Sequence, residues 1–256
     1  MRHRKAPSTG RTNSGHPDSR DVTDHPPPLP GTFLAHLPPA DRDRLATIAT
    51  TRRHAARTDL FHQGDPSRYV MILLSGWIKV TSVSREGQEA LLALRGPGDI
   101  IGDLAAIDGG VRSGTVTTLT ALQAYVIDGN QFVDLVVNQP RLALGLLRHL
   151  VRGLRQSDVK RLEYVSANSF ARLAGLLANL ADEHGRLTPE GIVIDLPLSQ
   201  RELATAAAAS REAVARAMRA LRDRDIVRTG RRRILVVAPL VLRALSRSTS
   251  DDPPGS

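Results

Sequence analysis

The chain has 256 residues, 41 % of them hydrophobic, and a formal net charge of +9, which suits one or two soluble domains. Its longest apolar stretch, 234–242, is too short for a membrane-spanning helix, and the basic N-terminus lacks the apolar run of a secretory signal. The absence of cysteine excludes disulfides, cysteine-ligated zinc, iron–sulfur clusters and thiol catalysis. We therefore expect a cytoplasmic protein.

The basic charge is concentrated near the C-terminus. Arginine accounts for nearly all basic residues, since lysine occurs only at Lys5, Lys79 and Lys160, and this preference by itself fits genomic base composition. Between residues 196 and 247, however, 12 arginines face four carboxylates. A concentrated basic segment indicates a polyanionic partner, most often nucleic acid.

The two ends of the chain differ in amino-acid composition from the middle. Residues 1–31 contain six prolines and few large apolar side chains, so we expect a disordered tail there and a second one at 248–256. Residues 52–128 alternate short apolar runs with turns such as Ser75-Gly76 and Gly96-Pro97-Gly98-Asp99. This pattern is typical of an antiparallel β-sandwich or barrel.

A long helix is predicted from Pro140 to about residue 168, because proline favours a first helical turn. Apolar and polar positions along it repeat at alternating spacings of four and three, which is the pattern of a coiled-coil seam. The members are Leu147, Val151, Leu154, Asp158, Arg161 and Val165. The alternative is a helix packed only on the β domain through Leu146, Leu150 and Leu162, and both arrangements are compatible.

The C-terminal region predicts two short capped helices followed by a hairpin. Ser199 and Glu202 form a capping-box pattern, and Ser210 caps a second helix after the small-residue stretch 206–209. Two apolar runs flank the basic segment 229–233 and suggest a hairpin. Together these elements predict a winged helix-turn-helix.

Two short motifs within the predicted β domain suit an anionic sugar ligand. Gly102-Asp103-Leu104 combines a glycine, which allows close backbone approach, with a carboxylate that accepts hydrogen bonds from ribose hydroxyls. Arg112-Ser113 supplies a guanidinium fork for phosphate oxygens. Each motif is common by itself, so their order along the chain carries the argument.

These motifs, with Gly64-Asp65, Gly76 and Gly98-Asp99 before them, resemble the cyclic-nucleotide-binding β-roll. The long helix and the segment 210–216 extend the resemblance, over about residues 52–247, to the CRP/FNR (catabolite-activator) family of transcription regulators. The resemblance implies an α+β protein with five parts, of which two are the terminal tails. These are a jelly-roll-like antiparallel β-roll at 32–137, a dimerisation helix at 138–168, a winged helix-turn-helix at 169–247, and the tails 1–31 and 248–256.

The resemblance also implies an effector site, with cAMP as the first candidate and cGMP as the second. The implied ligands are Gly102, Asp103, Leu104, Arg112, Ser113, Ser157 and Asp158. Asp103 is one methylene shorter than the family's usual glutamate, which puts the ribose contact in question. Asp158 would suit the two adjacent donors of guanine; the alternative is a solvated helix charge.

For DNA, the resemblance assigns the second short helix to the major groove of a TGTGA-like half-site. Arginines there read guanine and a glutamate reads the cytosine amino group. The expected contacts are Ser199, Gln200, Ser210, Arg211, Glu212 and Arg216, with Arg228, Arg231, Arg232 and Arg233 on phosphates. Ala208 stands where the family's turn usually has glycine.

We therefore expect a homodimeric, sequence-specific transcription regulator rather than an enzyme, acting on palindromic double-stranded DNA, with RNA polymerase as a further partner and no membrane association. One alternative is an effector-independent regulator with a vestigial pocket. A more remote one is a cupin-like metalloenzyme, but residues 52–128 offer only His54 and His62 as histidine ligands, and no catalytic or metal site is expected.

Overall fold

The computed structural model describes residues 25–66, 68–166, 168–230 and 233–247, without the side chains of 156 and 158–166. Residues 1–24 of the predicted N-terminal tail (1–31), the whole predicted tail 248–256, and Arg231 and Arg232 therefore lie outside the described residues. The prediction of a disordered N-terminal tail nevertheless includes too many residues at the tail's C-terminal end. The Leu29 amide donates to the Pro97 carbonyl at 2.9 Å, so part of 25–31 packs on the β domain.

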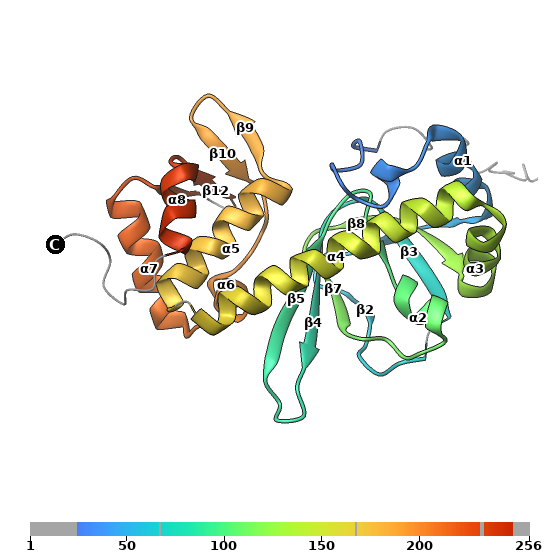
Figure 1. The fold of residues 1–256 in the computed structure, drawn as a ribbon, viewed down its shortest axis with the longest axis horizontal. Helices are drawn as coiled ribbons and strands as arrows, with labels where there is room; N and C mark the ends of the chain where they lie inside the picture. The colour runs from blue at the N-terminus through green and yellow to red at the C-terminus, as the bar shows by residue number, and fades with distance from the viewer. Residues whose placement is uncertain (1–24, 67, 167, 231–232, 248–256) are drawn as a thin grey trace, which may run out of the picture.

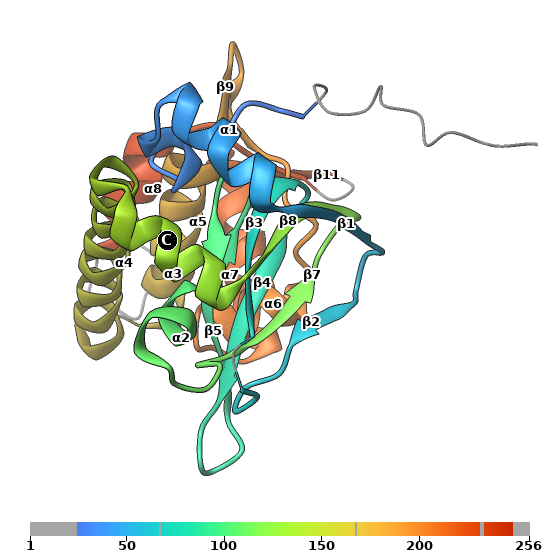
Figure 2. The same cartoon turned by 90° about the vertical axis from the view of Figure 1, so that its right-hand side faces the viewer.

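Two antiparallel four-stranded sheets form the N-terminal domain, as the alternation of apolar runs and turns predicts (Figure 2). The strands are β1 (Thr50–His54), β2 (Asp59–Phe61), β3 (Tyr69–Ser75), β4 (Ile78–Val83), β5 (Glu89–Arg95), β6 (Ile100–Ile101), β7 (Thr115–Thr118) and β8 (Leu122–Asp128). One sheet has the order β1-β8-β3-β6 and the other the order β2-β7-β4-β5. The β4–β5 hairpin extends beyond the rest of the roll (Figure 1).

Strand β3 is buried on both faces, because its alternate side chains enter two different cores. Met71 and Leu73 pack between the two sheets with Phe61. Val70 and Ile72 face the opposite way, toward the helices. A strand buried on both sides explains the unbroken apolar run at 70–74, since neither face meets water.

Helices cover the outer face of the first sheet. They are η1 (Leu34–His36), α1 (Pro39–Ile48), α2 (Asp103–Asp108), α3 (Gly129–Asn138) and α4 (Pro140–Ser166). Phe33 and Phe132 are fully buried beneath them, with ring centroids 6.4 Å apart. Sequence analysis predicted α4 but not the shorter helix α1, which has no clear apolar periodicity in its own sequence.

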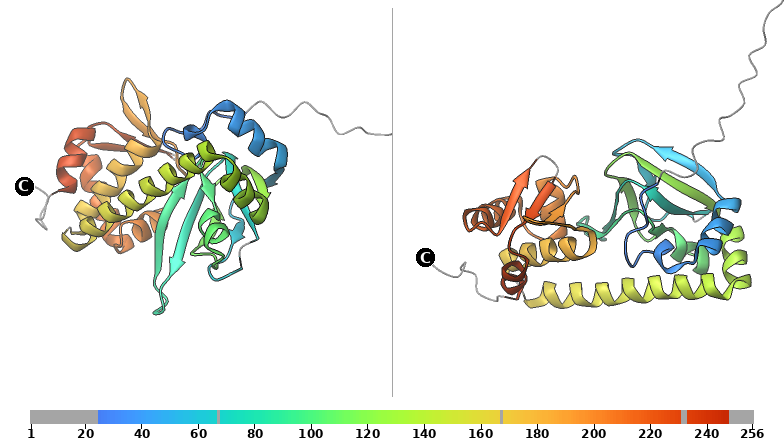
Figure 3. Two further views of the ribbon diagram at one scale, coloured as in Figure 1. Left: turned by 45° about the vertical axis from the view of Figure 1, so that its right-hand side comes forward. Right: turned by 90° about the horizontal axis from the view of Figure 1, so that it is seen from above.

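Helix α4 runs along one side of the molecule and passes both domains (Figure 3). Its first half buries Leu142 and Leu146 against the β domain, while Leu147, Val151 and Leu154 remain 40–63 % exposed. Both predicted roles of this helix are therefore compatible with the structure. Among the described residues, no helix has the length and apolar character needed to cross a membrane.

The C-terminal domain contains four helices and a small antiparallel sheet. The elements are α5 (Ser169–His184), β9 (Arg186–Thr188), β10 (Gly191–Ile194), α6 (Gln200–Ala206), α7 (Arg211–Asp223), β11 (Val227–Gly230), β12 (Arg233–Val236) and α8 (Pro239–Ser246). The sheet order is β11-β12-β10-β9, and the β11–β12 hairpin is the predicted wing. Helices α6 and α7 begin where the two predicted caps place them.

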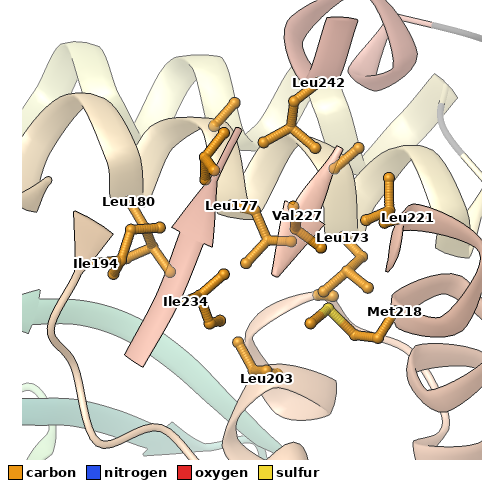
Figure 4. Packing of buried hydrophobic residues seen from close by; sticks show 14 of the residues in the cluster. Leu173, Leu177, Leu180, Ile194, Leu203, Met218, Leu221, Val227, Ile234 and Leu242 are labelled. Atoms are coloured by element: carbon orange, nitrogen blue, oxygen red, sulfur yellow. The ribbon is translucent and has the colours of Figure 1, made fainter. Parts of the chain in front are cut away.

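The core of this domain brings together α5, the sheet and both short helices (Figure 4). Leu173, Leu177 and Leu221 are fully buried there. Leu94 of β5 and Leu119, both from the N-terminal domain, belong to the same cluster. The two domains thus share apolar packing, and α6 lies against β5.

Candidate functional site

A cavity of about 500 Å³ lies in the N-terminal domain, bounded by strands of the second sheet, the segment around α2 and helix α4. Its volume is within the range of small-molecule sites. The structure brings together along its wall six of the seven residues that sequence analysis assigned to an effector. These are Gly102, Asp103, Leu104, Arg112, Ser113 and Ser157.

Gly102 is needed for the turn that leads into α2. Its φ is +80°, a left-handed conformation that favours glycine, and it occupies the N-cap position. A β-carbon there would lie 2.1 Å from Nη1 of Arg112 and 3.1 Å from the Tyr69 carbonyl oxygen. Glycine therefore lets the backbone approach the guanidinium closely.

Asp103 directly follows this turn and is only 7 % exposed. Burial raises the pKa of its carboxyl group, and the backbone amides of Asp103 and Leu104 oppose that rise, as do the charges of Arg95 and Arg112. The carboxylate is thus a desolvated acceptor on the cavity wall, which is the position expected of the ribose-binding group.

Arg112 is 4 % exposed and is held by backbone carbonyls rather than by a carboxylate. Its Nη2 donates to the Tyr69 carbonyl at 2.6 Å and its Nη1 to the Gly102 carbonyl at 3.1 Å. The guanidinium carbon lies 3.8 Å from the centroid of the Phe61 ring. Burial lowers its pKa, and the nearby charges of Asp103 and Asp65 oppose that decrease. These contacts fix the fork at the cavity wall and stabilise the surrounding fold as well.

Helix α4 closes the other side of the cavity with His149, Leu150, Gly153, Leu154 and Ser157. Burial lowers the pKa of His149 to about 4, and nearby arginines contribute to that decrease, so the imidazole is neutral at pH 7. The side chain of Asp158, the seventh predicted effector residue, lies outside the described part of the structure.

A second, smaller cavity of about 100 Å³ lies between the domains. It shares Arg95, Gly153 and Ser157 with the first cavity and is lined on its far side by α5 and the end of α6. The wall of the 500 Å³ cavity is therefore also part of the junction between the domains.

The first helix of the helix-turn-helix, α6, begins with the predicted capping box. The Ser199 hydroxyl accepts from the Glu202 amide at 3.2 Å, and Oε2 of Glu202 accepts from the Ser199 amide at 2.8 Å. Oε1 of Glu202 also lies 3.3 Å from Nζ of Lys79 on β4. Burial alone would raise the pKa of Glu202, but the Ser199 hydrogen bonds and the Lys79 charge outweigh it and the pKa is lowered.

The turn between α6 and α7 contains the alanine that sequence analysis singled out. Ala208 has a φ of +43°, so the left-handed conformation is present and costs an alanine about 1–2 kcal/mol. Arg172 of α5 donates through Nε to the Ala207 carbonyl at 2.9 Å and through Nη2 to the Ala208 carbonyl at 3.0 Å. These bonds hold the turn in place.

Helix α7 separates a buried apolar face from an exposed charged one. The hydroxyl of its N-cap, Ser210, accepts from the Ala213 amide at 3.1 Å. Val214 and Leu221 are fully buried on the apolar face. The predicted base-reading residues are exposed: Arg211, Glu212 and Arg216. The N-cap residues Ser199 and Ser210, and Gln200 at the start of α6, are exposed as well.

The wing strands carry two of the arginines that were predicted to contact phosphates, Arg228 and Arg233. Arg228 forms a two-point ion pair with Asp225, with distances of 2.7 and 2.8 Å, and so already has an anionic partner. Arg233 at the start of β12 is exposed. Within the described ranges, no group of three or more histidines or carboxylates is placed to hold a metal ion.

Comparison with known families identifies both domains. Residues 51–139 match the model of the cyclic nucleotide-binding domain, and residues 171–245 match that of the Crp-like helix-turn-helix domain. The chain belongs to the CRP/FNR family of transcription regulators. The curated relatives of this family member are likewise transcription regulators and not enzymes.

Two curated relatives illustrate the extent of the similarity. The CRP-like cAMP-activated global transcriptional regulator of Mycobacterium tuberculosis is 29 % identical over 177 residues, covering 69 % of this chain and 79 % of that protein. The cyclic AMP receptor protein of Thermus thermophilus is 27 % identical over 205 residues, covering 79 % and 91 %. The structure of FixK2 from Bradyrhizobium japonicum is 19 % identical, with a TM-score of 0.68 over 79 % of this chain and all of that one, and shows the same fold.

Sequence analysis missed several residues at the functional sites of this family member. Arg95 lines both cavities, Gly153 opens the α4 wall, Lys79 joins the domains and Arg172 holds the turn. A glycine in the middle of a 27-residue helix was a visible signal, because glycine weakens a helix interior. The other three needed the tertiary structure.

Proposed function

We propose that this regulator is a homodimer that binds a palindromic, TGTGA-like DNA site and is controlled by a cyclic nucleotide in the 500 Å³ cavity. The observation that carries the proposal is the cavity wall. One side of it is the nucleotide-binding cassette at 102–113, and the other is α4, which also reaches the DNA-binding domain. In this proposal residues 32–137 bind the effector, 138–168 dimerise and 169–247 bind DNA.

The exposed face of α7 supplies sequence recognition. Arg211 and Arg216 pair with guanine in the major groove, and Glu212 accepts from the cytosine amino group. Ser199 and Gln200, at the start of α6, and Ser210 lie near the phosphates. Arg231, Arg232 and Arg233 of the wing bind phosphates and add affinity without sequence choice.

Dimerisation through α4 places two copies of α7 on the two half-sites. Leu147, Val151 and Leu154 form an exposed apolar stripe that a second copy would cover. Leu147→Glu, which does not line the cavity, is expected to yield monomers in sedimentation velocity. A dimer that persists unchanged in this variant would place the interface elsewhere.

Two effectors are candidates, and one alternative has structural support. The curated relatives carry cAMP in their names, which favours cAMP, whereas Asp158 favours cGMP. The vestigial-pocket alternative draws on Arg112, whose guanidinium is already bonded to two carbonyls, and on the short side chain of Asp103. RNA polymerase is the expected protein partner at a promoter.

The DNA-binding proposal is tested by titrating the protein on a TGTGA-type palindrome and on a scrambled duplex. Arg211→Ala should weaken binding to the palindrome by about 1–3 kcal/mol and change binding to the scrambled duplex much less. Arg243→Ala is the matched control, because Arg243 lies on α8 and pairs with Asp182. Equal losses on both duplexes for Arg211→Ala would contradict the assignment of α7.

A further inference from the structure

Arg95, the last residue of β5, occupies a position that the nucleotide-binding cassette does not include. It is half-buried and lines the effector cavity, the interdomain cavity and a third small cavity beside Asp99. Within the described part of the chain, its guanidinium donates one hydrogen bond, from Nη1 to the adjacent Leu94 carbonyl at 3.1 Å. The guanidinium therefore retains donors for a ligand in the cavity.

The charge of Arg95 is offset by buried carboxylates. Asp99 is 6 % exposed and accepts from the Gly96 amide at 2.9 Å, and Asp103 is similarly buried. The charge of Arg95 stabilises the ionised form of both groups. Because two carboxylates offset part of its charge, the guanidinium of Arg95 contributes directional hydrogen-bond donors more than net positive charge. It therefore suits a neutral acceptor edge better than a second phosphate.

The surroundings of Arg95 leave room for a flat base. Arg112 and Ser113 lie in the cassette, whereas Arg95 borders the cavity together with Gly153 and Ser157 of α4. A β-carbon built on Gly153 would meet nothing within 4 Å, so this glycine leaves open space on the helix side. A sugar phosphate held by the cassette would direct its base toward this side.

Arginine distinguishes the two purines because it donates hydrogen bonds and accepts none. Guanine presents two adjacent acceptors, O6 and N7, which match a guanidinium fork. Adenine presents N7 beside an amino group, so its donors would face the donors of Arg95. A donor-only side chain at this wall therefore favours guanine.

We propose that Arg95 reads O6 and N7 of a guanine base, and that the effector is a guanine cyclic nucleotide. This inference rests on the proposed function of the cavity and reverses the order of candidates that the relatives' names suggest. Arg95 is then the specificity-determining residue of the site, while the cassette binds the sugar phosphate common to both nucleotides.

The test is isothermal titration of the full chain with cGMP, cAMP and cyclic IMP, which keeps O6 and N7 but lacks the guanine amino group. Wild type should bind cGMP and cyclic IMP about tenfold or more tightly than cAMP. Arg95→Gln should reverse the preference, since glutamine both donates and accepts and pairs with the N6–N7 edge of adenine. Arg85→Gln, on the exposed tip of the same hairpin, should leave all three affinities unchanged.

Three results would overturn the inference. Wild-type preference for cAMP would contradict it, as would an equal loss of all three ligands in Arg95→Gln. Binding of none of them to wild type would remove the proposed function itself, and this inference with it. If Arg95→Gln fails to fold, Arg95→Lys replaces it; a donor-only lysine should keep the preference for cGMP.

Discussion

The proposed effector cavity and the proposed reading helix α7 use charged side chains in opposite ways. Asp103 and Arg112 in the cavity are less than a tenth exposed, and Arg112 is bonded to two backbone carbonyls. Arg211, Glu212 and Arg216 on α7 are exposed, and the helix is held by its buried apolar face. The charged groups of the cavity are thus part of the buried fold, whereas those on α7 lie on the surface and are available for recognition.

The largest expected effect of this contrast is on stability. Arg112→Ala should lower the free energy of unfolding by about 2–6 kcal/mol, because two carbonyl groups lose their donor at about 1–3 kcal/mol each. Arg211→Ala should change it by less than about 0.5 kcal/mol. Urea denaturation of both variants measures the difference, and similar values for the two would break the comparison.

The buried carboxyl group of Asp99 should make the stability of the fold depend on pH. Burial raises its pKa from 3.8 to about 6, so between these values the folded state holds a proton that the unfolded state has lost. The stability linked to Asp99 is therefore complete below about pH 4 and is lost as pH rises through 6, a change of about 3 kcal/mol. Asp99→Asn keeps the Gly96 hydrogen bond and should lack this loss.

The exposed carboxylate of Glu212 on α7 should change the stability with pH in the opposite direction. The backbone amide of Glu212 and the Ser210 hydroxyl lower the pKa of Glu212, so its stabilising contribution is present at neutral pH and is lost on acidification. Urea denaturation at several pH values, with Glu212→Gln as the matched variant, measures both signs. If the contributions of Asp99 and Glu212 to stability change with pH in the same direction, the contrast between buried and exposed charges would be contradicted.

Backbone strain in the helix-turn-helix turn predicts a smaller effect. Ala208 adopts a φ of +43°, which glycine tolerates without the steric cost that alanine bears. Ala208→Gly should raise the thermal midpoint, by the equivalent of up to about 1 kcal/mol. Ala209→Gly, next to it but without a positive φ, should be destabilising by about 0.5–1 kcal/mol.

The smallest expected effect concerns the ion pair between Lys79 of β4 and Glu202 of α6, which joins the two domains. Lys79 and Glu202 are partly exposed, so their interaction should contribute about 1 kcal/mol or less. A double-mutant cycle with Lys79→Met and Glu202→Gln isolates this coupling from the role of Glu202 in the capping box. Coupling that does not weaken in high salt would show that the pair is not electrostatic.

Features that depend on neighbouring residues could be predicted from the sequence, whereas features that depend on tertiary contacts could not. The starts of α6 and α7 follow from Ser199 and Ser210, because capping depends on residues three apart. The length of α4 follows from its periodicity and its opening proline. The apolar stretch 234–242, in contrast, divides into β12 and α8 at Ala238-Pro239, which local apolar pattern does not reveal.

The cavity was predictable only through motif order. Six residues were assigned from a resemblance, and the structure places them along one cavity: Gly102, Asp103, Leu104, Arg112, Ser113 and Ser157. Arg95 and Arg172 carry no local signal that separates them from the many other arginines of the chain. Their partners lie far away in sequence, so only the folded structure shows what they contact.

The central claim is that occupancy of the cavity strengthens binding by α7, and one linkage measurement tests it most directly. Operator affinity is titrated at saturating cGMP, at saturating cAMP and without nucleotide, for wild type and for Ser113→Ala, whose exposed side chain can be removed without disturbing the core. The account predicts that a nucleotide raises wild-type affinity, and that Ser113→Ala reaches the same plateau at higher nucleotide concentration. Operator affinity that is identical in all three conditions would contradict it.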